Sequence, residues 1–211
     1  MQVSCSYLPP QVGSQMRMAY QGVSGIVFGY EDYPITQAMV DNIPYASMRM
    51  KIGKGGAGFL ILKEKNANIN SWVSSDEITF NIKHGRIVET YGLFNDLNYY
   101  YGSDKDLSFS SLLKKNIPLK KSIRTISLSN PEVRGLIIEV STEVKGLERV
   151  TILNKSYDLI LIEETIINSY IKWVSVNQYW VDPSDGFVWK SNQKIAPNIP
   201  LIKIEILKKP A

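Results

Sequence analysis

The chain has 211 residues, of which 44% are hydrophobic and 21% charged, with a formal net charge of +4. This is the composition of an ordinary globular protein, so we expect one domain over residues 1–211. The basic residues are scattered and answered locally by acidic ones, which argues against nucleic acid as a partner. One cysteine and one histidine exclude an intramolecular disulfide framework and a Cys/His zinc cluster. No apolar run approaches the ~20 residues of a membrane-spanning helix.

The first 42 residues are predicted to form a tether and a helical segment. Residues 1–11 contain Cys5 and two prolines and are typical of a tether. Within the helical segment, residues 12–42, apolar side chains recur at helical spacing over residues 12–28. A shorter helical turn is expected from Thr36, a good N-cap residue, to Val40, before Pro44 stops it.

From residue 43 to the end, the apolar period changes to two. Short segments rich in Ile, Val, Tyr, Phe and Thr alternate with turn signals such as "KGGAG", "KHG", "VKG" and "DPSDG". Many strands joined by short turns predict a mainly β fold, an antiparallel meander that closes into a barrel or a curved half-barrel. The longest interruption, Leu97–Leu119, is predicted to be a loop with one helical turn.

For two short motifs, a structural interpretation is favoured over a functional one. "GKGGAG", with Gly53, Gly55 and Gly58, fits G-x-G-x-x-G, but a strand-like segment follows it where a dinucleotide site needs a helix. We therefore expect a hairpin turn. His84 lies in "KHGR", which is typical of a two-residue turn with a positive φ at Gly85. A catalytic triad would have to use this turn residue as its base, so it is unsupported.

Three carboxylate pairs are candidates for acid and base in sugar chemistry. The Asp182 and Asp185 pair flanks Pro183 in a turn that requires such residues for backbone reasons alone. The structural interpretation is therefore favoured, and we predict no catalytic residues. The other two pairs are Asp76–Glu77 and Glu163–Glu164.

The stretch "YWVDPSDGFVWKSNQ", Tyr179–Gln193, is predicted to be a hairpin around "DPSDG". If Tyr179 lies opposite Trp189, these two residues share an apolar, core-facing side with Val181 and Phe187. Trp180 then lies on a mixed face and becomes the best candidate for a surface aromatic that stacks on a sugar. Tyr170, on the same face, and Trp173, on the other, are weaker candidates for this binding surface.

Several segments resemble the YjbF/GfcB family, the group 4 capsule and exopolysaccharide lipoproteins of Gram-negative bacteria. The similar segments are "IPYASMRM" at 43–50, "WVSSDEITFNIKHGRIVETYGL" at 72–93, "VKGLERVTILNK" at 144–155 and the C-terminal stretch from Tyr179. They occur in the family's order and cover most of the chain from about Ile35 onward.

The resemblance implies a non-catalytic envelope protein with a β-barrel-like fold, anchored by a lipidated cysteine in the outer membrane, facing the periplasm. Cys5 is the candidate for lipidation, but Gln2 departs from the lipobox pattern. Either the sequence begins inside a truncated precursor, which is the favoured interpretation, or Cys5 is not the lipidated residue. The expected partners are polysaccharide-secretion proteins of the envelope or the polysaccharide itself, and no cofactor is expected. Two alternatives stay open: a polysaccharide-modifying enzyme that uses paired carboxylates, and a barrel that binds a lipid or small ligand.

Overall fold

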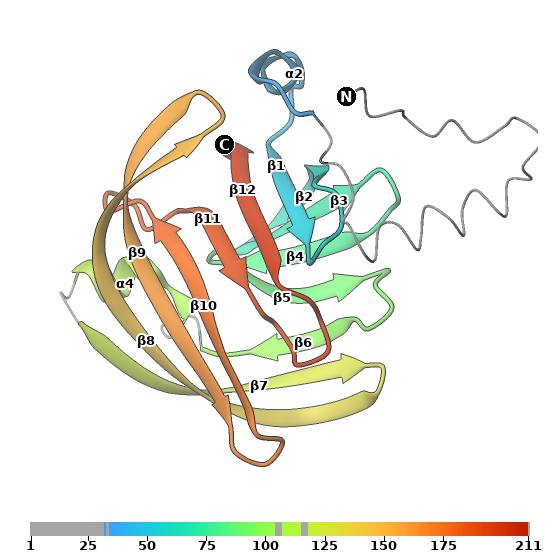
Figure 1. Ribbon diagram of the computed structural model, residues 1–211, viewed down its shortest axis with the longest axis vertical. Coiled ribbons are helices and arrows are strands. Elements are labelled where there is room, and N and C mark those ends of the chain that lie inside the picture. Colours follow the sequence, from blue (N-terminus) through green and yellow to red (C-terminus); the bar gives the residue numbers. More distant parts are fainter. Residues whose placement is uncertain (1–31, 33, 104–106, 115–117, 211) are drawn as a thin grey trace, which may run out of the picture.

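The computed structural model describes residues 32, 34–103, 107–114 and 118–210. Its strands form one 12-stranded antiparallel sheet, with two short helices (Figure 1). The elements are α2 (Gln37–Asn42), β1 (Ser47–Ile52), β2 (Gly58–Asn66), β3 (Ile69–Ser74), β4 (Thr79–Lys83), β5 (Arg86–Tyr91), β6 (Leu97–Tyr101), α4 (Phe109–Lys114), β7 (Leu119–Ser129), β8 (Glu132–Ile152), β9 (Lys155–Asn168), β10 (Trp173–Val181), β11 (Val188–Gln193) and β12 (Ile202–Lys208).

The sheet curls into a nearly closed barrel, which confirms the predicted antiparallel meander. Except for β5 and β6, strands that follow one another along the chain pair with each other. The first strand, β1, also pairs with the last strand, β12, so these two lie side by side in the middle of the sheet. The two end strands are β5 and β6, which lie next to each other without a ladder between them (Figure 1). Thr90 of β5 bridges this seam, since its hydroxyl donates to Asp96 at 2.8 Å and accepts from the Leu97 N–H at 2.9 Å.

Local sequence explains several elements. Thr36 caps α2, because its hydroxyl accepts from the Met39 N–H at 3.3 Å. In β1, Met48 and Met50 face the core while Arg49 and Lys51 face outward, as alternation requires. The predicted helical turn with its Thr36 cap is confirmed, although it ends at Asn42 and not at Val40. The tether, the predicted helix at 12–28 and Cys5 lie outside the described residues. The single-domain expectation stays a prediction.

Both predicted turns are present. "GKGGAG" joins β1 to β2 as a hairpin, with Gly53 at φ +55°. His84 and Gly85 form the two-residue turn between β4 and β5, with φ values of +48° and +80°. Gly85 is also required by packing, since a Cβ there would lie 2.2 Å from a methyl group of Val188.

Two expectations about strand boundaries are wrong. "VKG" is not a turn: it lies inside the 21-residue strand β8, where the register with β9 shifts between Val144 and Gly146. Gly146, at φ +150°, accommodates this bulge, so the chain bends there and continues as the same strand. In the segment Leu97–Leu119, the predicted helical turn is present as α4, but the segment begins with the strand β6 and not with a loop.

The barrel interior is the main core. Its apolar cluster comes from inward-facing side chains of most strands and includes Trp72, Phe80 and Met48. The helix α4 contributes to a second inner cluster, in which Phe109 and Leu112 pack against residues of β9, β10 and β11. A third cluster surrounds Trp180 and joins the β8–β9 hairpin to α2 and β12. Its buried members are Val40, Val150, Ile152, Leu159, Leu161, Trp180 and Leu207.

Candidate functional site

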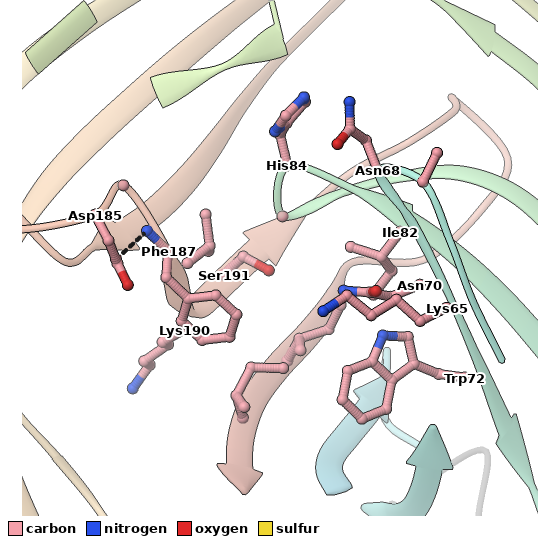
Figure 2. A pocket seen from close by; sticks show the side chains of 16 residues that line it. Lys65, Asn68, Asn70, Trp72, Ile82, His84, Asp185, Phe187, Lys190 and Ser191 are labelled. Atoms are coloured by element: carbon pink, nitrogen blue, oxygen red, sulfur yellow. Dashed lines mark hydrogen bonds between the residues drawn. The ribbon is translucent and has the colours of Figure 1, made fainter. Parts of the chain in front are cut away.

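A cavity of about 290 Å³ lies at one end of the barrel, between three hairpin turns (Figure 2). We call it the mouth cavity. The turns join β2 to β3, β4 to β5 and β10 to β11, and they meet because β2, β4 and β10 run in the same direction in an antiparallel sheet. Its rim is exposed at Ala67, Asn68 and Asp185, while Trp72 and Ser191 at its base are buried.

The mouth cavity combines side-chain amides with aromatic rings. Asn68 and Asn70 come from the β2–β3 hairpin, and the ring of Phe187 faces them from the β10–β11 side (Figure 2). Amides both donate and accept hydrogen bonds, whereas an aromatic ring binds apolar ring faces without desolvating charge. The volume is near the lower limit of small-molecule sites, which begin at about 300 Å³. This chemistry suits one unit of a polyhydroxylated ligand.

The β10–β11 loop is held in place by its own side chains. Asp182 accepts from the Ser184 N–H at 2.9 Å, and Asp185 accepts from the Phe187 N–H at 2.8 Å. Gly186, at φ +78°, packs so closely on α4 that a Cβ would lie 2.6 Å from the Cβ of Ser110. The loop therefore presents Phe187 to the mouth cavity in a defined position.

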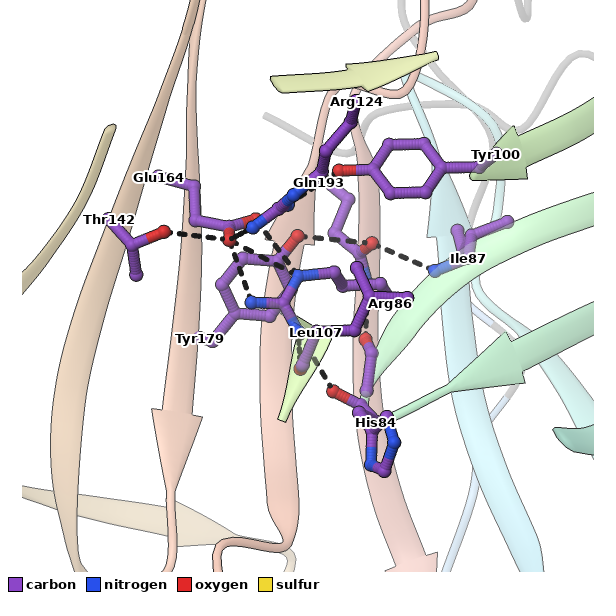
Figure 3. A network of polar contacts seen from close by, with 11 residues as sticks. His84, Arg86, Ile87, Tyr100, Leu107, Arg124, Thr142, Glu164, Tyr179 and Gln193 are labelled. Atoms are coloured by element: carbon purple, nitrogen blue, oxygen red, sulfur yellow. Dashed lines mark hydrogen bonds and ion pairs between the residues drawn. The ribbon is translucent and has the colours of Figure 1, made fainter. Parts of the chain in front are cut away.

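Deeper in the barrel lies a buried ionic network centred on Glu164 of β9 (Figure 3). Its carboxylate accepts from Arg86 of β5 at 2.7 Å and from Arg124 of β7 at 2.7 Å. Thr142 of β8 donates to the same carboxylate at 3.1 Å, and Arg124 also donates to the Tyr100 hydroxyl of β6 at 2.6 Å. All three charged side chains are at most 2% exposed.

This network joins the two end strands of the sheet through the barrel interior. Arg86 belongs to β5 and Tyr100 to β6, and Glu164 and Arg124 connect them. Arg86 also donates to the Leu107 carbonyl, just before α4, and its guanidinium lies 3.8 Å from the centre of the Phe109 ring. The network thus closes the seam that the backbone leaves without a ladder.

The electrostatics keep Glu164 ionised. Burial by itself raises the pKa of Glu164, but the charges of Arg86 and Arg124, with their hydrogen bonds, outweigh it and hold that pKa well below the ordinary 4.5. A carboxylate held in this way is a poor proton donor near neutral pH, so it is unsuited to general acid catalysis. Its role is to balance the buried guanidinium groups.

Sequence reasoning missed this network, although a signal for it exists. Alternation places Arg124 on the same strand face as Ile126 and Leu128, and Glu164 on the same face as Ile162 and Ile166. A charged residue on an otherwise apolar, inward face indicates a buried partner of opposite charge.

The structure corrects the predicted aromatic surface. Trp180 is only 9% exposed and Trp173 only 7% exposed, so neither is a free stacking platform. Tyr170 is 92% exposed, in the turn between β9 and β10. The indole N–H of Trp180 donates to Glu148 at 2.7 Å, from the β8–β9 hairpin that covers this side of β10. That hairpin is distant in sequence and was not accounted for.

The predicted hairpin register is also wrong. Tyr179 pairs with Ser191 and Trp180 with Lys190, and a bulge then shifts the register so that Val181 pairs with Val188. As a result, Tyr179 and Val181 face α4 with Val188, while Trp189 lies outside that cluster, half-buried, and stacks on Tyr157 at 4.4 Å between ring centres.

Two of the three candidate carboxylate pairs make hydrogen bonds that hold the fold together. Asp182 and Asp185 accept the loop hydrogen bonds given above. Glu163 and Glu164 lie on opposite faces of β9: Glu163 accepts from Gln178 at 3.0 Å, whereas Glu164 is in the buried network. The remaining pair, Asp76–Glu77, is exposed in the β3–β4 turn.

Among the residues with described positions, no group of three His, Cys, Asp or Glu side chains is placed to hold a metal ion. In the described part of the chain, no helix has both the length and the hydrophobicity needed to cross a membrane.

Comparisons with known proteins agree with this architecture. The family model described as "Group 4 capsule polysaccharide lipoprotein gfcB, YjbF" matches residues 20–207. The chain is 22% identical to the uncharacterized lipoprotein GfcB of Escherichia coli K12 over 183 residues, covering 86% of this chain and 85% of that protein. It is 21% identical to the uncharacterized lipoprotein YjbF of the same organism, covering 97% and 92%.

A solved structure shows the same fold. The crystal structure of the hypothetical lipoprotein YmcC from E. coli K12 matches with a TM-score of 0.72 at 19% identity, covering 97% of this chain and 99% of that one. The family match extends over most of the barrel, including the strands that carry the mouth cavity and the buried network. The chain therefore belongs to the YjbF family of group 4 capsule polysaccharide lipoproteins.

Proposed function

We propose that this protein is a non-catalytic lipoprotein, anchored through Cys5 at the periplasmic face of the outer membrane, that supports capsule or exopolysaccharide production by binding the polymer. The mouth cavity is the observation that carries the proposal. It presents amide groups of Asn68 and Asn70 and the Phe187 ring around a volume that accommodates one small polar unit. Sugars combine hydroxyl groups with apolar ring faces, and both find partners there.

A binding function fits the chemistry of the site better than an enzymatic one. Hydrolysis of a glycosidic bond uses two carboxyl groups that flank the bond. Asp185, at the rim of the mouth cavity, is engaged by the Phe187 N–H and by Lys209, and Glu164 lies outside the cavity in the buried network. Neither is arranged with a facing carboxylate across the cavity.

The experiment is a titration of the protein with size-fractionated oligosaccharides from the exopolysaccharide of the producing cells. We expect binding that weakens at least fivefold in Phe187→Ala and Asn70→Ala, since each removes one type of contact. Phe94→Ala, which removes a 91% exposed aromatic ring in the loop between β5 and β6, is the matched control. Equal affinity in all variants would contradict binding in the mouth cavity.

The same preparations test the absence of catalysis. After incubation with the polymer, its size distribution is compared by chromatography. Shortening that disappears in Asp185→Asn would overturn the non-catalytic assignment.

The anchor is tested by fractionating cells that express the full precursor: a product that stays soluble, whether or not Cys5 is changed to Ala, would overturn the lipid anchor.

Binding of a polysaccharide-secretion protein is a second candidate function. On the outward side of β7 to β10, the exposed residues Ile167 and Val174 are direct cross-strand partners. Ile123 lies in the same row beyond Glu139, and Ile137 lies two residues before Glu139 on β8. Exposed apolar side chains gathered over adjacent strands are typical of protein contact surfaces. Ile137→Lys is expected to reduce capture of envelope secretion proteins and to leave oligosaccharide binding unchanged.

A further inference from the structure

A second concavity, of about 420 Å³, lies on the outward side of β1, β12 and β11. We call it the basic groove. Four cationic side chains line it, Arg49, Lys51, Lys190 and Lys203, with two carboxylates, Asp32 and Glu205. Trp180 and Asn192 complete the polar part of the lining. Four positive and two negative charges leave the basic groove with a net charge of +2.

The strand register places two of these cations side by side. Lys51 of β1 and Lys203 of β12 are direct cross-strand partners and point to the same face. Like charges in such a position destabilise a sheet unless a negative charge lies between or above them. The neighbouring row is balanced, because Glu205 lies between Arg49 at 3.8 Å and Lys190 at 3.2 Å. The unbalanced positive charge of the Lys51–Lys203 pair therefore favours binding of an anion.

The chain itself supplies one such anion. Asp32, which precedes β1 by 15 residues, accepts from the Arg49 guanidinium at 2.7 Å, from the Lys51 ammonium at 2.8 Å and from the Ala57 N–H at 3.1 Å. These contacts, led by the hydrogen bond from Lys51, lower the pKa of Asp32 to about 2. One guanidinium, one ammonium and one backbone N–H converging on a carboxylate are the elements of a carboxylate-binding site.

Asp32 is placed so that another carboxylate can replace it. Its side chain is 36% exposed, and its partners Arg49 and Lys51 are 36% and 33% exposed. Ion pairs between partly exposed side chains are individually weak in water, so another carboxylate can compete with the internal occupant. Beside it, the Lys190 ammonium lies 5.3 Å from the centre of the Trp180 ring, which extends the positive surface along β11.

We propose that the basic groove binds the carboxylate groups of an acidic polysaccharide, of the uronic-acid type, and that Asp32 is its displaceable internal occupant. The polymer as ligand rests on the proposed function, whereas the acidic class comes from the groove. A polymer carboxylate takes the place of Asp32 between Arg49 and Lys51, and Lys203 engages the same or the next acidic sugar. Binding then weakens as salt is added, because the contacts are charged and exposed.

The test uses oligogalacturonates as the acidic probe and glucan oligomers of equal length as the neutral one, in calorimetric titrations at low and physiological salt. Asp32→Asn keeps an acceptor for the Ala57 N–H but removes the competing charge. We expect it to tighten oligogalacturonate binding about fivefold or more, the low end of typical coupling between two ligands of one site. Lys51→Gln with Lys203→Gln is expected to weaken binding at least tenfold.

Lys155→Gln with Lys172→Gln is the matched control, because it also removes two positive charges, at the exposed first residue of β9 and in the exposed β9–β10 turn. Thermal melts establish that each variant is folded. Unchanged or weaker binding in Asp32→Asn would overturn the role of Asp32, and equal binding in the double lysine variant would overturn the groove.

Phe187→Ala separates this proposal from the mouth cavity. If it abolishes binding of cell-derived oligosaccharides while the lysine variants do not, the groove proposal fails and the proposed function stands. If only the lysine variants and Asp32→Asn change binding, the mouth cavity fails and the groove stands.

Discussion

The two halves of the barrel interior are built on different physical principles. The inner faces of β1 to β4 and β12 carry apolar side chains such as Trp72, Phe80 and Met48, all at most 2% exposed. The inner faces of β7 to β9 also carry apolar side chains, such as Ile126 and Ile166, but among them lie Arg124, Thr142 and Glu164, all at most 3% exposed. An apolar wall is stabilised by burial alone, whereas a polar one is stable only while every charge keeps its partner. These charged side chains also connect β5 and β6, the two end strands of the sheet.

The largest expected effect is the removal of Glu164. Glu164→Ala leaves Arg86 and Arg124 without their common carboxylate in a buried site, and we expect a loss of about 5 kcal/mol in unfolding free energy, near the top of the range for broken buried pairs. Urea denaturation measures it. Glu163→Gln, one residue away on the outer face with a half-exposed partner, should cost about 0–1 kcal/mol. Similar losses of unfolding free energy for both variants would contradict the expected difference between the buried network and the outer face of β9.

In the apolar half, Trp72→Ala is expected to cost about 4 kcal/mol, because it removes a fully buried indole and leaves a cavity. The same denaturation experiment applies, with Tyr45→Ala, at a 57% exposed residue, as the control. A loss below about 1 kcal/mol would mean that this wall is not closely packed.

The two halves should differ in their response to acid. Because the folded-state pKa of Glu164 lies below its ordinary 4.5, its contribution to stability is fully present above about pH 4.5 and is lost as pH falls through the folded-state pKa. One such group contributes a slope of at most about 1.4 kcal/mol per pH unit. Denaturation of the wild type, Glu164→Gln and Trp72→Ala between pH 7 and 3 tests this. Only Glu164→Gln should flatten the acid limb, and parallel curves for all three would refute the assignment.

The smallest expected effect concerns the two faces of β10 and β11. We expect Trp180→Ala to cost about 3 kcal/mol, since Trp180 is buried and bonded to Glu148. Trp189→Ala should cost about 1–2 kcal/mol less, because Trp189 is only half-buried, although it stacks on Tyr157. The hairpin register predicted from sequence requires the opposite order, so chemical denaturation of both variants decides between the two.

The errors of prediction arise from features that neighbouring residues do not reveal. Alternation and turn residues located β1, the His84–Gly85 turn and the "DPSDG" loop, because these depend on neighbouring residues. The bulges at Gly146 and after Trp180 were missed, since a bulge changes the register without a consistent local signature. One such shift misplaced Trp189 relative to the core, whereas Trp180 is buried because the β8–β9 hairpin covers it.

The β class, the meander order, the cap of α2 and, through resemblance, the family could be predicted from the sequence. These follow from periodicity, turn chemistry and segment order, which are properties of neighbouring residues. The folded structure was needed to show that Arg86 meets Glu164 across 78 positions and that Asp32 lies between Arg49 and Lys51. The physical reason is that ion pairing depends on distances of a few ångströms, and these are set by strand register and by closure of the sheet, not by separation along the chain.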